Sequence, residues 1–168
     1  MSKLKKRVAL VIGSGAIKCA ASIGMFQVLK EENIGVDLVV GCSGGAIYGV
    51  GIAAGMDPEE VQELSDSTWT KELMQGYLVN LKASKDGTLK FNERSGLVDD
   101  TYLNEKLKNI AGGRLFSDLS TPLIVVATDM MNGEPVELLE GDVFNSVRAS
   151  LAIPMIFPPL GDRGQVAN

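Results

Sequence analysis

Apolar and polar positions in the first third of the chain switch between strand-like and helical spacing. Residues 7–12 are short, apolar and β-branched, with charge before and glycine after, which predicts a buried strand. Residues 19–32 have the apolar spacing of an amphipathic helix. A second buried strand is expected at residues 37–42 and a helix of small and apolar residues at 44–54. This order, with short connections, predicts an α/β protein with a parallel sheet.

The rest of the chain predicts further helices and one hairpin. Asp57 followed by Pro58 begins a helix, because aspartate caps a helix N-terminus and proline fits its first turn. The later expectations are helix 69–81, loop 82–94, helix 100–111, strand 122–128, strand 134–139 and helix 143–150. Asn132-Gly133 lies between the two strands and is a strong hairpin signal. We therefore expect one mainly parallel sheet.

Composition narrows the class of protein. The chain has 168 residues, with 45% hydrophobic and 22% charged, which fits one globular domain. A net charge of −5 provides no basic surface for nucleic acid. The basic cluster at residues 3–7 is explained best as a solvated N-terminus, with a lipid-surface contact as the alternative. Two cysteines make no disulfide framework, so the cytoplasm is the expected compartment.

The chain contains no histidine. A Ser-His-Asp triad, a Cys-His pair and every histidine-ligated metal site are therefore excluded within it. A nucleophile that needs a base must rely on a carboxylate or a lysine. We expect no metal and no cofactor.

Gly41-Cys42-Ser43-Gly44-Gly45 fits G-x-S-x-G between a predicted strand and a predicted helix. A tight turn there lifts the serine hydroxyl clear of the sheet edge, and the flanking glycines Gly41 and Gly45 remove side chains that would clash. The helix N-terminus that follows favours negative charge. We predict that Ser43 is a nucleophile; the alternative is a glycine-rich turn that holds a serine by chance. Cys42 precedes the apex, so its side chain should point away.

A second small-residue loop follows the first predicted strand, and it consists of Gly13, Ser14, Gly15 and Ala16. In a parallel sheet this loop lies at the same edge as Ser43. Its backbone N–H groups, together with that of Gly44, are the predicted oxyanion hole. A dinucleotide-binding loop is less favoured, because Lys18 stands where G-x-G-x-x-G has its third glycine. A structural β–α turn is the remaining alternative.

These features together resemble the patatin-like phospholipase family. That family pairs a glycine-rich oxyanion loop after the first strand with G-x-S-x-G on the next strand–helix turn, and it uses a Ser-Asp dyad without histidine. Similar segments continue at residues 115–122, 127–134 and 148–159. The resemblance covers almost the whole chain. It implies a three-layer α/β/α fold with a mainly parallel central sheet, similar to malonyl-transferases and lysophospholipases.

The oxyanion loop departs from the family at two positions. Lys18 occupies the place of an arginine, and Cys19 occupies the place of the last glycine. Lysine keeps the charge but loses the planar fork of arginine. The Cβ of a cysteine could shift the loop and weaken an oxyanion donor, so we expect lower activity or a different substrate.

The family's catalytic aspartate lies in a D-G-G or D-G-A segment that follows a short hairpin after the stretch similar to residues 157–159. Here residues 161–164 resemble the hairpin turn, and the aspartate is expected just after Asn168. Residues 1–168 are therefore expected to be the N-terminal part of a single acyl hydrolase domain. Either the chain is a fragment, or a complementary C-terminal chain stays bound and supplies the aspartate. Asp162 is a less favoured base because it lies in the turn, and Asp129 is expected to bond loop amides.

The resemblance implies a carboxylic ester hydrolase that acts on phospholipids, lysophospholipids or acylglycerols. Peripheral contact with a membrane surface is an additional possibility for such a cytoplasmic protein. The alternatives are an acyltransferase of the same fold and a catalytically silent protein that binds a lipid or a partner. The apolar residues that could line an acyl pocket are Ile17, Met25, Tyr48, Met155 and Ile156. Core packing explains most of them equally well.

Overall fold

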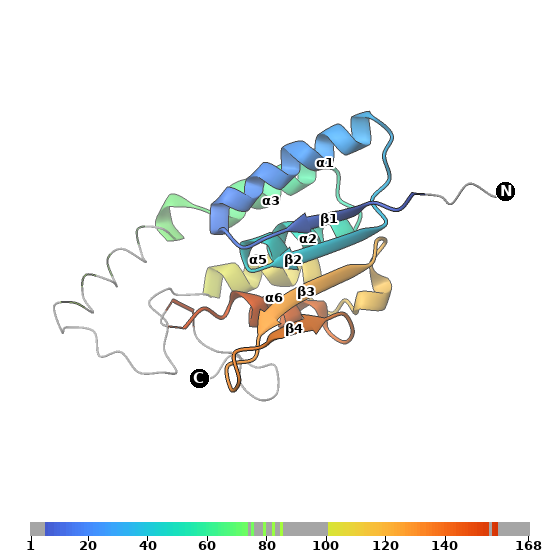
Figure 1. Cartoon of the computed structure of the whole chain (residues 1–168). Helices are drawn as coiled ribbons and strands as arrows, with labels where there is room; N and C mark the ends of the chain where they lie inside the picture. The colour runs from blue at the N-terminus through green and yellow to red at the C-terminus, as the bar shows by residue number, and fades with distance from the viewer. Residues whose placement is uncertain are drawn as a thin grey trace.

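The computed structural model describes residues 6–73, 75, 79, 82, 85, 101–154, 156 and 157. These residues form a four-stranded sheet in the order β1-β2-β3-β4 (Figure 1). The strands are β1 (Ala9–Ile12), β2 (Leu38–Cys42), β3 (Leu123–Thr128) and β4 (Pro135–Leu138). The first three are parallel, and β4 is antiparallel to β3. The predicted α/β class and mainly parallel sheet are confirmed.

The helices follow the predicted order, with small shifts at their ends. They are the 3-10 helix η1 (Ala16–Ala20), α1 (Ala21–Glu31), α2 (Gly44–Ala53), α3 (Pro58–Thr68), α5 (Thr101–Ala111), the 3-10 helix η2 (Phe116–Asp118) and α6 (Val143–Leu151). Residues 71–73, 75 and 79 are helical, as expected. Lys82 and Lys85 are also helical, where a loop was predicted. Polar composition suggested a loop, but lysine is a good helix former, and the turn residues Asp86-Gly87 come only afterwards.

The core lies between the sheet and helix α2. Every residue of α2 is buried, and α2 packs on β2, α5 and α6. In Figure 1 these helices lie behind the sheet, while α1 and α3 lie together above β1. A helix of glycine, alanine and β-branched residues suits this position, because small side chains let neighbouring backbones approach closely.

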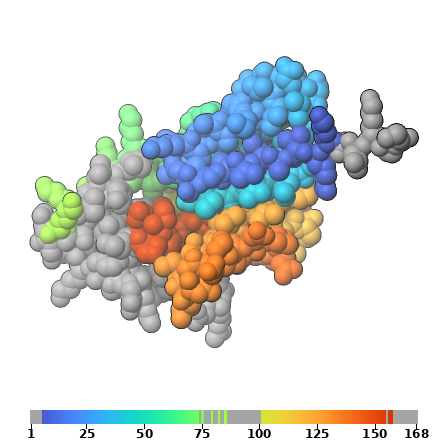
Figure 2. Space-filling model, in the orientation of Figure 1, coloured from blue at the N-terminus to red at the C-terminus, as the bar shows by residue number. Residues whose placement is uncertain are grey.

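The strands are buried mainly on the face that α2 covers. Leu10, Ile12 and Val39 are buried, whereas Val11 between them is 68% exposed. The prediction of a buried first strand is therefore correct for only one face of β1, because Ala9 and Val11 are exposed. β1 lies at the edge of this sheet, and Figure 2 shows it at the molecular surface beside α1.

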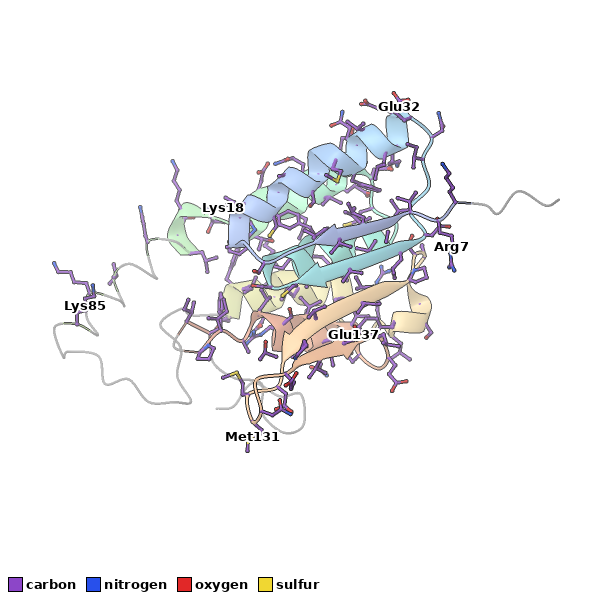
Figure 3. The ribbon with its side chains drawn as sticks, in the orientation of Figure 1. Arg7, Lys18, Glu32, Lys85, Met131 and Glu137 are labelled. Carbon is purple, nitrogen blue, oxygen red and sulfur yellow. The ribbon has the colours of Figure 1, made fainter. Side chains whose placement is uncertain are left out.

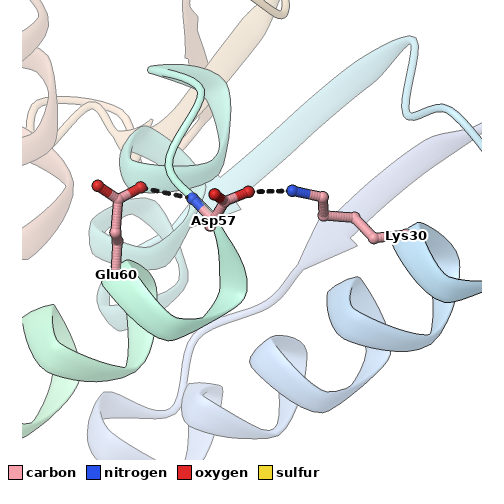
Figure 4. A network of polar contacts seen from close by, with 3 residues as sticks. All are labelled: Lys30, Asp57 and Glu60. Carbon is pink, nitrogen blue, oxygen red and sulfur yellow. Dashed lines mark hydrogen bonds and ion pairs between the residues drawn. The ribbon is translucent and has the colours of Figure 1, made fainter.

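The start of α3 confirms the predicted cap. The Glu60 carboxylate accepts a hydrogen bond from the Asp57 N–H at 2.7 Å. Lys30 of α1 forms an ion pair with Asp57 (Figure 4). Both partners are well exposed, so the pair adds little stability beyond the cap itself. No helix in the described ranges is long and apolar enough to span a bilayer.

Candidate active site

Ser43 forms the apex of a tight turn between β2 and α2. Its backbone has φ 53° and ψ −125°, a conformation that residues other than glycine rarely adopt. Such a conformation costs about 1–3 kcal/mol and persists only where the surrounding structure enforces it. The predicted strand–turn–helix setting of Ser43 is thus observed, and the turn is strained at the serine itself.

Close backbone contacts require the glycines that follow Ser43. A Cβ on Gly45 would lie 2.2 Å from the carbonyl oxygen of Ile12, and one on Gly44 would lie 2.7–2.8 Å from backbone atoms of Ala16. Gly41 before the serine is pressed equally closely against the start of α2. The turn therefore packs directly on the end of β1 and the loop after it.

This loop, residues 13–16, reaches the same edge of the sheet, as predicted. The register pairs Ile12 with Gly41, so the carboxyl ends of β1 and β2 lie side by side. Ala16 has φ 49°, also in the left-handed region. The N–H of Lys18 donates to the carbonyl of Gly15 at 3.0 Å, which closes the turn into η1.

Hydrogen bonds of Cys19 stabilise the same loop. Its thiol donates to the carbonyl of Gly13 at 3.2 Å, and its own carbonyl accepts from the hydroxyl of Ser22 at 2.7 Å. Burial raises the pKa of the Cys19 thiol, while a backbone hydrogen bond lowers it by less and nearby Cys42 adds to the rise. The thiol is therefore protonated at neutral pH, as a hydrogen-bond donor must be.

Ser150 on α6 joins the site, and sequence reasoning gave it no role. Its hydroxyl oxygen accepts from the Ser43 N–H at 2.7 Å and donates to the carbonyl of Val126 at 2.6 Å. The available signal was its place in the segment 148–159 that resembles the family. A motif match alone does not say which backbone group a hydroxyl will contact.

The carboxylate of Asp129 belongs to the β3–β4 hairpin. It accepts from the N–H of Met131 at 2.8 Å, and the Asp129 backbone bonds Glu134 and Gly133. This confirms the expected loop-amide role. Within the described ranges no carboxylate hydrogen bonds to Ser43, and no group of three potential metal ligands occurs. Asp162 lies outside the described residues.

A hollow of about 310 Å³ lies along β1, the residue 13–15 loop and the start of α1. Lys18, Cys19 and Met25 line it, and Lys18 and Met131 lie toward the end of the molecule to which β1, β2 and β3 point (Figure 3). Of the proposed acyl-pocket residues, Ile17 and Met25 are 53% and 59% exposed.

The other acyl-pocket candidates have different surroundings. Tyr48 is fully buried, and its hydroxyl lies 2.8 Å from that of Ser65, so it belongs to the core. Burial raises the pKa of Tyr48. Ile156 packs against the core, and Met155 lies outside the described residues.

Solved structures share this arrangement. The type III effector protein ExoU aligns with a TM-score of 0.53 and 22% identity, over 88% of this chain and 40% of ExoU. ExoU in complex with SpcU, from the type III secretion system of Pseudomonas aeruginosa, aligns with a TM-score of 0.54 and 20% identity, over 90% and 39%. At these identities the likeness shows the fold.

Sequence relatives extend the comparison. An uncharacterized NTE family protein of Mycobacterium tuberculosis is 31% identical over 153 residues, which are 91% of this chain and 39% of the relative. Patatin-like phospholipase domain-containing protein 7 of Mus musculus is 28% identical over 155 residues, 92% of this chain and 11% of that protein. The chain thus spans well under half the length of these relatives. The family model for patatin-like phospholipases matches residues 10–165, and the chain therefore belongs to that family.

Proposed function

We propose that this chain carries the nucleophile of a serine-dependent lipid acyl hydrolase, similar to an esterase or phospholipase A. The observation that carries the proposal is the strained conformation of Ser43, φ 53° and ψ −125°, at the start of α2. Membership of the patatin-like phospholipase family supports a lipid substrate. Strain at a nucleophile is typical of turns that present a serine hydroxyl to a substrate.

The proposed reaction is acyl transfer through a covalent intermediate. The Ser43 hydroxyl attacks the ester carbonyl while a carboxylate takes its proton, and the ester C–O bond then breaks as the alcohol leaves with a proton. Water attacks the acyl-serine in the second step and releases the fatty acid. The N–H of Gly44, at the first turn of α2, and the N–H groups of Gly15 and Ala16 would hold the oxyanion. Each such donor is worth about 3–4 kcal/mol in the transition state.

We assign the base to an aspartate just beyond Asn168, in the same polypeptide or on a complementary C-terminal chain, with Asp162 as the less favoured candidate. The greater length of the relatives supports this assignment. A carboxylate is a weak base, and desolvation in a closed site raises its pKa toward the range where it can accept a proton.

Two other functions use the same residues differently. An acyltransferase would pass the acyl group to an acceptor alcohol in place of water. A catalytically silent member would bind a lipid or a partner through the same loop. Lys18 and Cys19, which differ from the arginine and glycine of the family pattern, support this alternative. Peripheral contact with a membrane fits all three.

The decisive experiment is intact mass spectrometry of the protein from the complete reading frame, before and after exposure to a fluorophosphonate. We expect one adduct on the polypeptide that carries Ser43, none in Ser43→Ala, and an unchanged adduct in the exposed control Ser117→Ala. A second polypeptide in the spectrum would identify the complementary chain.

The outcomes separate the alternatives. An adduct that persists in Ser43→Ala contradicts the assignment of Ser43 as the nucleophile. A wild-type protein without any adduct is catalytically silent. With an adduct present, release of free fatty acid identifies a hydrolase, and an ester of an added alcohol identifies a transferase.

A further inference from the structure

The Ser150 hydroxyl takes the place of one missing hydrogen bond between the parallel strands β2 and β3. The N–H of Val39 donates to the carbonyl of Pro122 at 2.9 Å. In a parallel pair such bonds recur at every second residue, so the same pattern directs the N–H of Ser43 to the carbonyl of Val126. In the structure that bond is replaced by two, from Ser43 to the hydroxyl and from the hydroxyl to Val126.

The reason for the replacement is the turn itself. At φ 53° the Ser43 backbone has left the strand conformation, and its N–H no longer faces the neighbouring strand directly. A half-buried N–H and a half-buried carbonyl would then lack partners at the end of the ladder, which is costly. A hydroxyl can accept from the first and donate to the second through a single oxygen atom.

Building on the proposed function, we propose that Ser150 is a positioning residue for Ser43. It fixes the strained turn through the N–H of the nucleophile without touching the reacting atoms. Because this N–H is occupied at 2.7 Å, it does not serve the oxyanion, and the N–H of Gly44 is the donor that the turn contributes. Ser150 also links α6 to the turn that carries the nucleophile, so the position of α6 relative to the turn is fixed.

The variants Ser150→Ala and Ser146→Ala, made in the full-length protein, test the proposal. Ser146 is a matched control because it lies one turn earlier on α6, is 8% exposed, and among the described residues its hydroxyl bonds the carbonyl of Asp142, the N-cap of α6, at 3.1 Å. Ser150→Ala should slow fluorophosphonate labelling of Ser43 and lower kcat by roughly 10- to 100-fold, with KM within about twofold, because the nucleophile is misplaced. Ser146→Ala should leave both rates unchanged.

Ser150→Thr keeps the hydroxyl and should regain activity. Equal labelling rates in Ser150→Ala and Ser146→Ala, or a loss carried by KM alone, would overturn the proposal.

A measurement on the wild-type protein covers the case in which Ser150→Ala does not fold. Hydrogen exchange resolved by fragmentation should show the Ser43 amide strongly protected, like the ladder amides of β2. Free exchange at Ser43 would overturn the proposal whether or not the protein is an enzyme. If the wild type is protected but not labelled by fluorophosphonate, the nucleophile assignment fails and the Ser150 bond stands.

Discussion

The thiol of Cys19 donates a hydrogen bond to the carbonyl of Gly13 at 3.2 Å, across the loop that joins β1 to η1. This loop packs on the turn that carries Ser43, because a Cβ on Gly45 would also meet the Gly13 carbonyl, at 2.6 Å. Cys19, which replaces the glycine of the family pattern, therefore stabilises the loop through a hydrogen bond within it. Cys19 is 8% exposed whereas Gly13 is exposed, so the bond is partly buried.

Removing this donor should destabilise the loop. Cys19→Ala should lower the free energy of unfolding by about 1 kcal/mol, because a partly buried hydrogen bond is lost and a buried sulfur atom is deleted. Cys19→Ser restores a donor and should recover part of that loss. Urea unfolding of both variants tests this, with Cys42→Ala as the control on a half-buried cysteine. Equal stability of the alanine and serine variants would show that the bond contributes nothing.

The raised pKa of the Cys19 thiol predicts a dependence of stability on pH. Above the ordinary thiol pKa of about 8.5 the unfolded chain ionises first. The folded protein, in which burial holds the pKa higher, does not ionise there. This contribution to stability is therefore complete below that pH and is lost as the pH rises toward the folded pKa.

The stability difference between wild type and Cys19→Ser should accordingly shrink between about pH 7.5 and pH 10. The pKa of Tyr48 is also raised, mainly by burial, and Tyr48 is present in both proteins; only the smaller contribution that Cys19 makes to this rise differs between them. Urea unfolding at several pH values measures the difference. A difference that stays constant across this range would contradict a raised pKa of Cys19 in the folded protein.

The contact between Gly45 and Ile12 makes the turn intolerant of any side chain. Gly45→Ala would place a methyl group 2.2 Å from the Ile12 carbonyl oxygen, so backbone must move. We expect a loss of about 3 kcal/mol or more, at the upper end for overpacking. Gly24→Ala is the control, since Gly24 lies exposed on α1 with nothing within 4 Å of its Cβ position. That variant should gain up to about 1 kcal/mol from helix propensity. Thermal unfolding compares the two, and similar melting temperatures would refute the contact.

Local signals were enough to predict the elements around the site. Glycine at three positions of 41–45 marked a turn where close backbone approach leaves no room for side chains. Asn132-Gly133 gave the hairpin, in which Gly133 has φ 78°. Periodicity gave α5 and α6 to within one residue. In each case the information lies within a few neighbouring residues.

Tertiary contacts of the site could not be predicted in the same way. Ser43 and Ser150 are 107 positions apart, and the packing of α6 on β3 and α2 brings them together. The exposure of Val11 depends on which elements cover the sheet, whereas its apolar character alone suggested burial. Cys19 was expected to disturb its loop, and no sequence pattern indicates that its thiol reaches Gly13.

Strain at Ser43 predicts that glycine is more stable than alanine at this position. Ser43→Gly and Ser43→Ala both remove the hydroxyl, but only glycine adopts φ 53° and ψ −125° without steric cost. Ser43→Gly should therefore be more stable than Ser43→Ala by about 1 kcal/mol or more. Neither should be labelled by a fluorophosphonate. If the alanine variant is the more stable one, the turn is relaxed in solution.

The hydroxyl pair of Tyr48 and Ser65 distinguishes a core residue from a substrate contact. The side chains are 0% and 4% exposed, and their oxygens lie 2.8 Å apart. Tyr48→Phe and Ser65→Ala should each cost about 1–2 kcal/mol, because each leaves one buried hydroxyl unpaired. The double variant should cost less than the sum, since neither partner then remains orphaned. Urea unfolding of the four proteins closes the cycle. Tyr48→Phe should also leave the preference for acyl-chain length unchanged, and a shifted preference would place Tyr48 in the acyl pocket.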